Sequence, residues 1–222
     1  MQSIVVGLTG QTGAGKSTAG EMLKRRGAVW VDADEIAHDV ADKEKNCLAD
    51  LALEFTIDIL NADGTLNRKR LGDIVFHDKA KLKRLNDLIF PYIIRAIAQT
   101  VQEMRAQGHE LVVLDAPTLF ESGADRFCDV VISIVAKEEV RRQRIIQRDG
   151  LSEEDADARI AAQHEESYYV RRSDFVVENN EGEDELRLSL SDVIGRILQG
   201  ERPRQQRREA EAQEEAANEA KQ

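Results

Sequence analysis

The sequence of 222 residues has only two cysteines, no excess of basic charge and no long apolar run. Cys47 and Cys128 are far apart and form no C-x-x-C motif, so we expect reduced, buried thiols rather than a disulfide. Acidic side chains outnumber basic ones by 42 to 31, which argues against nucleic acid or an anionic membrane as a partner. No run approaches the ~20 apolar residues needed to cross a bilayer, and the first residues lack a basic signal segment. We therefore expect a soluble, cytoplasmic protein.

Five short runs rich in branched apolar residues predict a buried parallel sheet. The runs are uninterrupted rather than alternating, as expected where helices cover both faces of the sheet, and helical segments separate them. This order predicts a doubly wound α/β fold in one compact domain, for which the chain has enough apolar residues. The five runs are residues 4–8, 28–31, 111–114, 130–135 and 175–177.

Three segments depart from a simple alternation of strand and helix. The connection between the second and third runs is too long for one crossover helix, and a turn at residues 61–64 divides its two helical patterns, so we expect an inserted helical subdomain. Residues 138–148 predict a basic helix, and Ser152, with Asp155 three positions later, predicts the capped start of a second helix. Residues 201–222 contain no large apolar side chain, which indicates a solvated helix or disorder.

The most informative motif is residues 10–18, GQTGAGKST, between the first run and a helix predicted at residues 18–25. It fits G-x-x-x-x-G-K-[ST], in which glycines let backbone N–H groups surround phosphates at a helix N-terminus. A dinucleotide site has a different glycine spacing and no lysine, and the other alternative is a flexible glycine-rich turn. The motif predicts a P-loop kinase that uses ATP and Mg²⁺. The expected nucleotide-binding residues are Gly10, Gly13, Ala14, Gly15, Lys16, Ser17 and Thr18.

Acidic residues follow two other predicted strands, where ligands of open parallel sheets bind. Of Asp32 and Asp34, one can accept the proton of an attacking hydroxyl while the other orients substrate or metal-bound water. The alternative for Asp34 is to cap a helix that begins near Glu35. A glycosyltransferase-type D-x-D metal site would leave the P-loop unexplained. Asp115 has the position of a Walker B acid, which holds Mg²⁺ directly or through water, and its alternative is a turn acid before Pro117.

Arg141, Arg144 and Arg148 are spaced by three and four residues, so they share one face of the predicted helix. One interpretation is a solvated charged face. The other is a lid that closes over ATP and sets Arg144 and Arg148 against the transferring phosphoryl group. The role of Arg141 stays open. Arg159 and Gln163, four apart on the following helix, face either the same cleft or solvent.

An ordered set of motifs resembles the dephospho-CoA kinases, which phosphorylate the ribose 3′-hydroxyl of dephospho-coenzyme A. The resemblance covers roughly residues 4–186. Two departures stand out: Phe90 occupies a position where the family usually has histidine, and Thr118 one where it usually has leucine. The motifs are residues 7–18, 31–34, 36–37, 66–68, 71, 75–76, 85–86, 91, 114–117, 119–121, 144, 148–149, 159–163, 177 and 179–180.

The resemblance implies the P-loop kinase fold, a five-stranded parallel sheet with helices on both faces, in a single domain of residues 1–200. The core would be residues 1–35, 108–137 and 172–200, with a coenzyme-binding helical insertion at 36–107, a lid at 138–171 and a charged tail at 201–222. The implied catalytic residues are Lys16, Asp34, Arg144 and Arg148, with Asp34 next to the acceptor hydroxyl. Substrate binding would involve Asp32, Asp34, Arg68, Pro117 and Leu119, and Ser17 and Asp115 would hold Mg²⁺.

The expected reaction is transfer of the ATP γ-phosphoryl group to dephospho-CoA, by a monomer or weak homo-oligomer. One alternative is a kinase of the same architecture that acts on a nucleotide, nucleoside or sugar. A GTP-dependent switch is disfavoured because an N-K-x-D motif is absent. A catalytically inactive binding module is disfavoured because Lys16, Ser17, Asp34 and Asp115 are all present.

Overall fold

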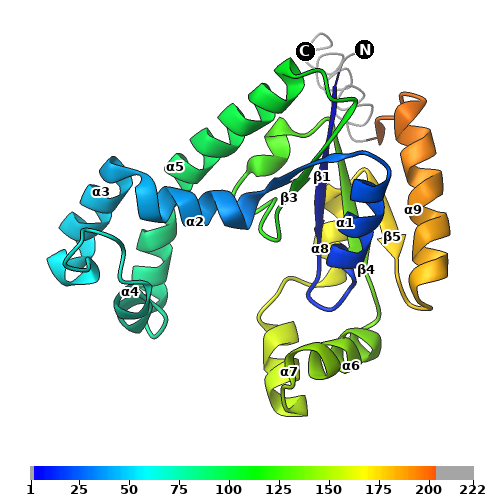
Figure 1. The fold of residues 1–222 in the computed structure, drawn as a ribbon. Helices are drawn as coiled ribbons and strands as arrows, with labels where there is room; N and C mark the ends of the chain where they lie inside the picture. Colours follow the sequence, from blue (N-terminus) through cyan, green and yellow to red (C-terminus); the bar gives the residue numbers. More distant parts are fainter. Residues whose placement is uncertain (1–2, 204–222) are drawn as a thin grey trace, which may run out of the picture.

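The computed structural model describes residues 3–203, in which the five predicted strands form one parallel sheet (Figure 1). The strand order is β2-β3-β1-β4-β5, so the strand that precedes the phosphate-binding motif lies at the centre. In register, Ile4 of β1 pairs with Leu111 of β3, and Val6 of β1 with Val130 of β4. The strands are β1 Ile4–Gly10, β2 Val29–Asp32, β3 Leu111–Asp115, β4 Val130–Val135 and β5 Phe175–Glu178.

Helices cover both faces of this sheet, which explains why the strands carry uninterrupted apolar runs. On one face, Val5 and Val112 pack in a core with α5 (Lys79–Ala106), while α8 (Glu166–Arg172) contacts β4 and β5. On the other face, Val6 and Ile132 pack in a second core that includes residues of α1 (Lys16–Arg25) and α9 (Glu183–Leu198). The predicted fold class is thus confirmed. Helix α8 was not among the predicted helices.

The long connection between β2 and β3 forms a helical projection on the left of Figure 1. It contains α2 (Ala33–Lys43), α3 (Lys45–Phe55), the 3₁₀ helix η1 (Ile57–Ile59) and α4 (Arg68–Val75), and α2, α3 and α4 contact α5. The predicted turn is present: Gly64 donates its N–H to the Asn61 carbonyl at 2.9 Å with φ of 83°. Leu51 and Phe55 are buried, so this projection has its own apolar contacts with α5.

A second helical projection, at the bottom of Figure 1, is the hairpin of α6 (Glu138–Asp149) and α7 (Glu153–Ala161). The predicted cap is present, because the Ser152 hydroxyl accepts from the Asp155 N–H at 3.1 Å. Ile145, Ala156 and Ile160 form a small apolar core between the two helices. The hairpin thus has few buried apolar contacts of its own.

The remaining expectations concern the cysteines, the membrane and the tail. Both cysteines are buried thiols, as predicted. None of the helices within residues 3–203 combines the length and apolar character needed to span a membrane. The predicted charged tail lies outside the described residues from position 204 onward.

Candidate active site

The phosphate-binding motif forms a tight loop between the last residue of β1, Gly10, and the first residue of α1, Lys16. Gly13 and Gly15 have φ of 76° and 100°, a region that L side chains rarely adopt. A Cβ atom at Gly15 would lie 2.2 Å from Asn179 Nδ2. Glycine is required here because the chain must turn left-handed against the loop that follows β5. The turn leaves the loop at the N-terminus of α1, where backbone N–H groups favour phosphate.

A cleft of about 530 Å³ opens over this loop. It is lined by the loop, by Pro117 after β3, and by side chains of the α6–α7 hairpin. The nucleotide-binding residues predicted at this cleft line it, apart from the buried Ala14. The lining residues are Gly10, Gln11, Thr12, Gly13, Gly15, Lys16, Ser17, Thr18, Pro117, Arg144, Gln147, Arg148 and Gln163.

Lys16 forms an ion pair with Asp115 at the carboxyl end of β3. The two side chains are only 18% and 15% exposed. Burial raises the pKa of the Asp115 carboxyl, and the Lys16 ammonium group opposes that rise. Since a lysine in a P-loop contacts phosphates, this ion pair holds the ammonium group at the base of the cleft.

The two acids after β2 have different roles in the structure. Asp32 Oδ1 accepts from the N–H groups of Asp34 and Glu35 at 2.9 and 3.1 Å, and so caps α2. The alternative that Asp34 is the cap is wrong, because α2 begins at Ala33, two residues before Glu35, and its N-cap residue is Asp32. The Asp34 carboxylate is exposed, with no hydrogen bond from any described residue. Asp32 pairs in register with Asp115, so all three acids follow neighbouring strands.

Arg144 supports the phosphate loop from behind. Its Nη1 donates to the carbonyl of Asn179 at 2.9 Å and, more weakly, to that of Ala14 at 3.5 Å. Asn179 Nδ2 donates to the same Ala14 carbonyl at 2.8 Å. The loop, α6 and the end of β5 are thereby joined, and Arg144 fixes the shape of the loop as well as lining the cleft.

Arg148 also lines the cleft, but its guanidinium group is paired with Asp149, with Nε to Oδ1 at 2.7 Å. This pair raises the pKa of Arg148 and lowers that of Asp149. Arg159 pairs with the same carboxylate and lies outside the cleft lining. Arg148 is 57% exposed, so it is held by one neighbouring carboxylate and not by the core.

Two side chains left open by the sequence have defined places. The amide oxygen of Gln163 accepts from the Thr12 N–H at 2.7 Å, so Gln163 faces the cleft. The Arg141 backbone lies against the loop, because a Cβ atom at Gly13 would be 2.7 Å from the Arg141 carbonyl oxygen. The Arg141 side chain is 5% exposed and does not line the cleft. Arg141 therefore differs from Arg144 and Arg148, although all three share a helix face.

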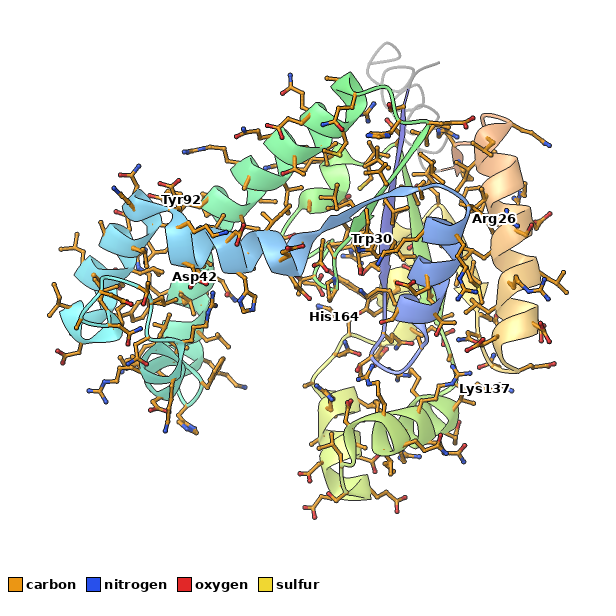
Figure 2. All side chains as sticks on the ribbon, viewed as in Figure 1. Arg26, Trp30, Asp42, Tyr92, Lys137 and His164 are labelled. Carbon is orange, nitrogen blue, oxygen red and sulfur yellow. The ribbon has the colours of Figure 1, made fainter. Side chains whose placement is uncertain are left out.

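The predicted substrate-binding residues are spread more widely. Pro117 lines the cleft, and its carbonyl accepts from Thr9 Oγ1 at 3.2 Å. Arg68 pairs with Asp42, labelled in Figure 2, at 2.9 Å, eight residues along α2 from Asp34, a rise of about 12 Å. Leu119 is fully buried in the core. A direct contact of the Leu119 side chain with substrate is not supported, because apolar neighbours enclose it.

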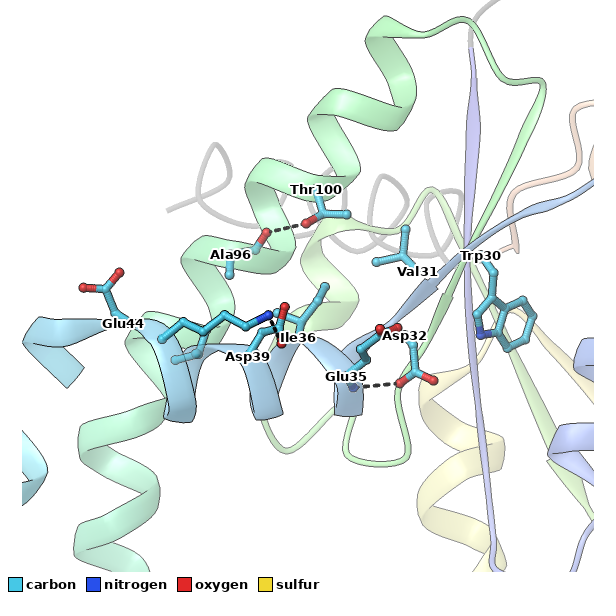
Figure 3. Close-up of a pocket in the computed structure, with 11 residues that line it drawn as sticks. Trp30, Val31, Asp32, Glu35, Ile36, Asp39, Glu44, Ala96 and Thr100 are labelled. Atoms are coloured by element: carbon cyan, nitrogen blue, oxygen red, sulfur yellow. Dashed lines mark hydrogen bonds and ion pairs between the residues drawn. The ribbon is translucent and has the colours of Figure 1, made fainter. Parts of the chain in front are cut away.

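A neighbouring cleft of about 410 Å³ lies between α2, the end of β2 and α5 (Figure 3). Asp32, one of the acids described above, lines this cleft, and Glu35 and Asp39 add further carboxylates. Lys43 on its wall is paired with Asp39 at 2.7 Å. With one paired cation among several carboxylates, this cleft is poorly suited to a phosphate group.

Magnesium fits the oxygen donors near Lys16. Ser17 lines the cleft, and Asp115, whose side chain is 15% exposed, adjoins it through its ion pair with Lys16. Among residues 3–203 no group of three or more acidic, histidine or cysteine side chains forms a metal cage. That agrees with Mg²⁺ chemistry in kinases, where one or two protein oxygens and the substrate phosphates share the ion.

A phosphate loop after the central strand of this parallel sheet places the chain in the class of P-loop kinases. A model of the dephospho-CoA kinase family matches residues 4–185, and the chain belongs to that family. The chain is 40% identical to a dephospho-CoA kinase of Lactobacillus johnsonii over 86% of this chain and 97% of the relative. It is 39% identical to that of Anaeromyxobacter dehalogenans over 90% and 94%.

A solved structure of a dephospho-CoA kinase from Campylobacter jejuni has the same architecture. It superposes with a TM-score of 0.66 at 30% identity, over 88% of this chain and 98% of the other. The family resemblance derived from the motifs is thus confirmed.

Proposed function

We propose that the protein transfers the γ-phosphoryl group of ATP to the ribose 3′-hydroxyl of dephospho-CoA, giving coenzyme A and ADP. The observation that carries this proposal is the relation of Asp34 to Lys16. Asp34 is an exposed, unpaired carboxylate just beyond β2, and Lys16 is anchored by Asp115 on the adjacent strand β3. A proton acceptor beyond β2 and a phosphate-binding cation held at the end of the adjacent strand β3 are the two groups that phosphoryl transfer to a hydroxyl needs.

In this mechanism the acceptor hydroxyl attacks the γ-phosphorus, the new O–P bond forms, and the bond to the β-phosphate oxygen breaks. Asp34 accepts the hydroxyl proton and orients the attacking oxygen. Lys16 and the loop N–H groups bind the phosphates, and Arg144 keeps the loop in shape. Arg148 leaves its ion pair with Asp149 and contacts the transferring phosphoryl group, whose negative charge it stabilises. Bound through Ser17 and Asp115, Mg²⁺ would neutralise phosphate charge.

We propose different roles for the two helical projections. Residues 36–107 would bind the coenzyme, with Arg68 on α4 directed at an anionic group after release from Asp42. Residues 138–171 would act as the lid. This assignment is supported by the placement of Arg148 and Gln163 on that segment and on the wall of the cleft.

An acceptor panel tests the reaction. ADP release is measured with dephospho-CoA, AMP, uridine and shikimate as acceptors, and we expect turnover with dephospho-CoA far above the others. Turnover of another acceptor, with none of dephospho-CoA, would assign the chain to a different small-molecule kinase.

A Lys16→Ala variant tests the site. It should lose turnover with dephospho-CoA and keep its circular dichroism spectrum, and retained turnover would remove the P-loop from the mechanism. The matched control is Lys43→Ala, which removes a lysine on α2 that is paired only with Asp39.

We also infer that the enzyme works in the cytoplasm as a monomer or weak homo-oligomer without nucleic acid. The net charge of −11 supports the last point. Size-exclusion chromatography with light scattering would measure the mass in solution.

A further inference from the structure

A separate cleft of about 410 Å³ adjoins the phosphate-binding cleft. The two share Gln11 and Gln163, but Lys16, Ser17 and Arg144 do not line the second one. Its walls are the first turn of α6 and residues 160–166, between α7 and α8. Figure 2 labels His164, which lines this space, and Lys137, the residue before the first turn of α6. We call this space the Arg141 cleft.

Two buried polar side chains of the Arg141 cleft have unsatisfied atoms. Arg141 is 5% exposed and Gln11 is 4% exposed. Nε and Nη1 of Arg141 and Oε1 of Gln11 have no hydrogen-bond partner within residues 3–203. Burial lowers the pKa of Arg141, yet a guanidinium group keeps its charge in proteins. Buried polar groups are nearly always hydrogen-bonded, so these atoms indicate a missing ligand.

Among the described residues, the surrounding acids form no ion pair with Arg141, although the charges of Glu138 and Glu166 act on it and oppose the lowering of its pKa by burial. Glu138 is paired with Arg142 at 2.8 Å, and Glu165 and Glu166 are exposed at the rim. Burial raises the pKa of nearby Tyr169 to about 12, so its hydroxyl is uncharged at neutral pH. No ion pair to Arg141 occurs among the described residues.

The first turn of α6 adds to the positive field at this place. The N-cap residue Lys137 makes no side-chain hydrogen bond to the helix, so the N–H groups of that turn lack a side-chain acceptor. The N-terminus of a helix favours an anion. The Arg141 cleft therefore combines buried donors, one buried acceptor and a helix N-terminus.

We propose that the Arg141 cleft binds a phosphate group, either inorganic phosphate or the end of a phosphomonoester. Phosphate oxygens accept from the guanidinium group of Arg141, while a protonated phosphate oxygen donates to Gln11 Oε1. Hydrogen phosphate and the monoanion of a phosphomonoester offer both acceptors and a donor, whereas sulfate and carboxylates offer acceptors alone at neutral pH. The site is distinct from that of the ATP phosphates, which Lys16 and Ser17 serve.

Calorimetric titration of inorganic phosphate tests this site. Because the P-loop itself binds phosphate, the protein is first saturated with Mg²⁺ and a non-hydrolysable ATP analogue. We expect one phosphate per chain, and binding about ten-fold weaker or more in Arg141→Met, since hydrogen bonds to charged groups are of that strength. The control is Arg171→Met, which removes an exposed arginine of α8 and should bind like the unmodified protein.

Titrations with two other anions distinguish the possible ligands. Sulfate should bind more weakly than phosphate, since it cannot donate to Gln11. Glycerol 3-phosphate binding as tightly as phosphate would point to a phosphomonoester, and weaker binding to free phosphate. Equal phosphate affinity in all three proteins, or no binding to the unmodified protein, would overturn the proposal.

A second measurement, which checks that the variant folds, is the midpoint of thermal unfolding without phosphate. Arg141→Met should be at least as stable as the unmodified protein, because it removes buried donors that lack partners. With the P-loop saturated with Mg²⁺ and the ATP analogue as before, added phosphate should then raise the midpoint of the unmodified protein and leave that of Arg141→Met unchanged. A crystal soaked in phosphate that shows only water beside Arg141 would contradict the assignment.

Discussion

Gln163 and Thr12 lie 151 positions apart in the sequence, and the Gln163 amide oxygen accepts the Thr12 N–H at 2.7 Å. This bond joins the end of the α6–α7 hairpin to the backbone of the phosphate loop. The N–H groups of such loops are phosphate ligands. The Thr12 N–H, a donor of the phosphate loop, is therefore hydrogen-bonded to Gln163 of the hairpin segment.

Replacing Gln163 tests whether this bond shapes the loop. In Gln163→Leu we expect ATP affinity to fall about two- to ten-fold, the range for one neutral hydrogen bond, with little change in melting temperature. Nucleotide binding is measured by calorimetry. Gln99→Leu on the exposed side of α5 is the control, and an equal loss there would show that the effect is not specific to the loop.

The two acids after β2 should separate catalysis from stability. Asp34→Asn should lower kcat by about 10²-fold or more, as loss of a general base does, and leave the melting temperature unchanged. Asp32→Ala should cost about 1 kcal/mol of unfolding free energy because α2 loses its cap. Asp32→Asn retains a capping oxygen and should restore most of that stability. Unchanged kcat in Asp34→Asn would remove Asp34 from the chemistry.

Arg144 and Arg148 should differ in steady-state kinetics. Arg144 holds the loop through the Ala14 and Asn179 carbonyls, so Arg144→Met should raise KM for ATP and lower the melting temperature. Among the described residues Arg148 hydrogen-bonds through its side chain only to Asp149, so Arg148→Met should lower kcat with little loss of stability. The same pattern of KM and kcat in both variants would contradict separate roles.

The thiol of Cys47 should resist alkylation. Burial, with smaller contributions from Asp50 and Glu44, raises its pKa to about 11 from 9.0. A raised pKa means less thiolate, about 100-fold less at pH 8 for two pKa units. In a Cys128→Ser background, iodoacetamide modification should stay slow at pH 8 and accelerate as the pH approaches 11. Rapid reaction at pH 8 in the folded protein would contradict the burial of this side chain.

The sequence predicts the sheet and the phosphate loop well because both depend on local patterns. Continuous apolar runs mark the strands, and the spacing of glycines and Lys16 marks the loop. The first helix begins at Lys16, two residues before the predicted start. That difference is small because Gly15, in its left-handed conformation, sets the boundary.

Contacts across the fold could not be predicted in the same way. Helical spacing gives Arg141 the same face as Arg144 and Arg148, yet the position of the loop beside α6 buries Arg141 and leaves Arg148 exposed. The link from Gln163 to Thr12 depends on how the hairpin returns to the sheet, which no local pattern encodes. Similarly, Leu119 is buried because its side chain packs against Gly7 of β1, and this contact between distant parts of the chain has no local sequence pattern.

The 28 residues of α5 form a rod of about 42 Å. Its last turn is anchored beside the start of β1, where Arg105 pairs with Asp129 at 2.8 Å and donates to the Ser3 carbonyl at 3.2 Å. Its first half carries α3 and α4. Ile97 and Val101 of its second half are buried in the core, so this half is fixed to the sheet. Pro91, which cannot donate a hydrogen bond to the preceding turn, lies between the two halves and is the position at which α5 bends most easily, and a bend there would move α3 and α4 relative to the phosphate loop.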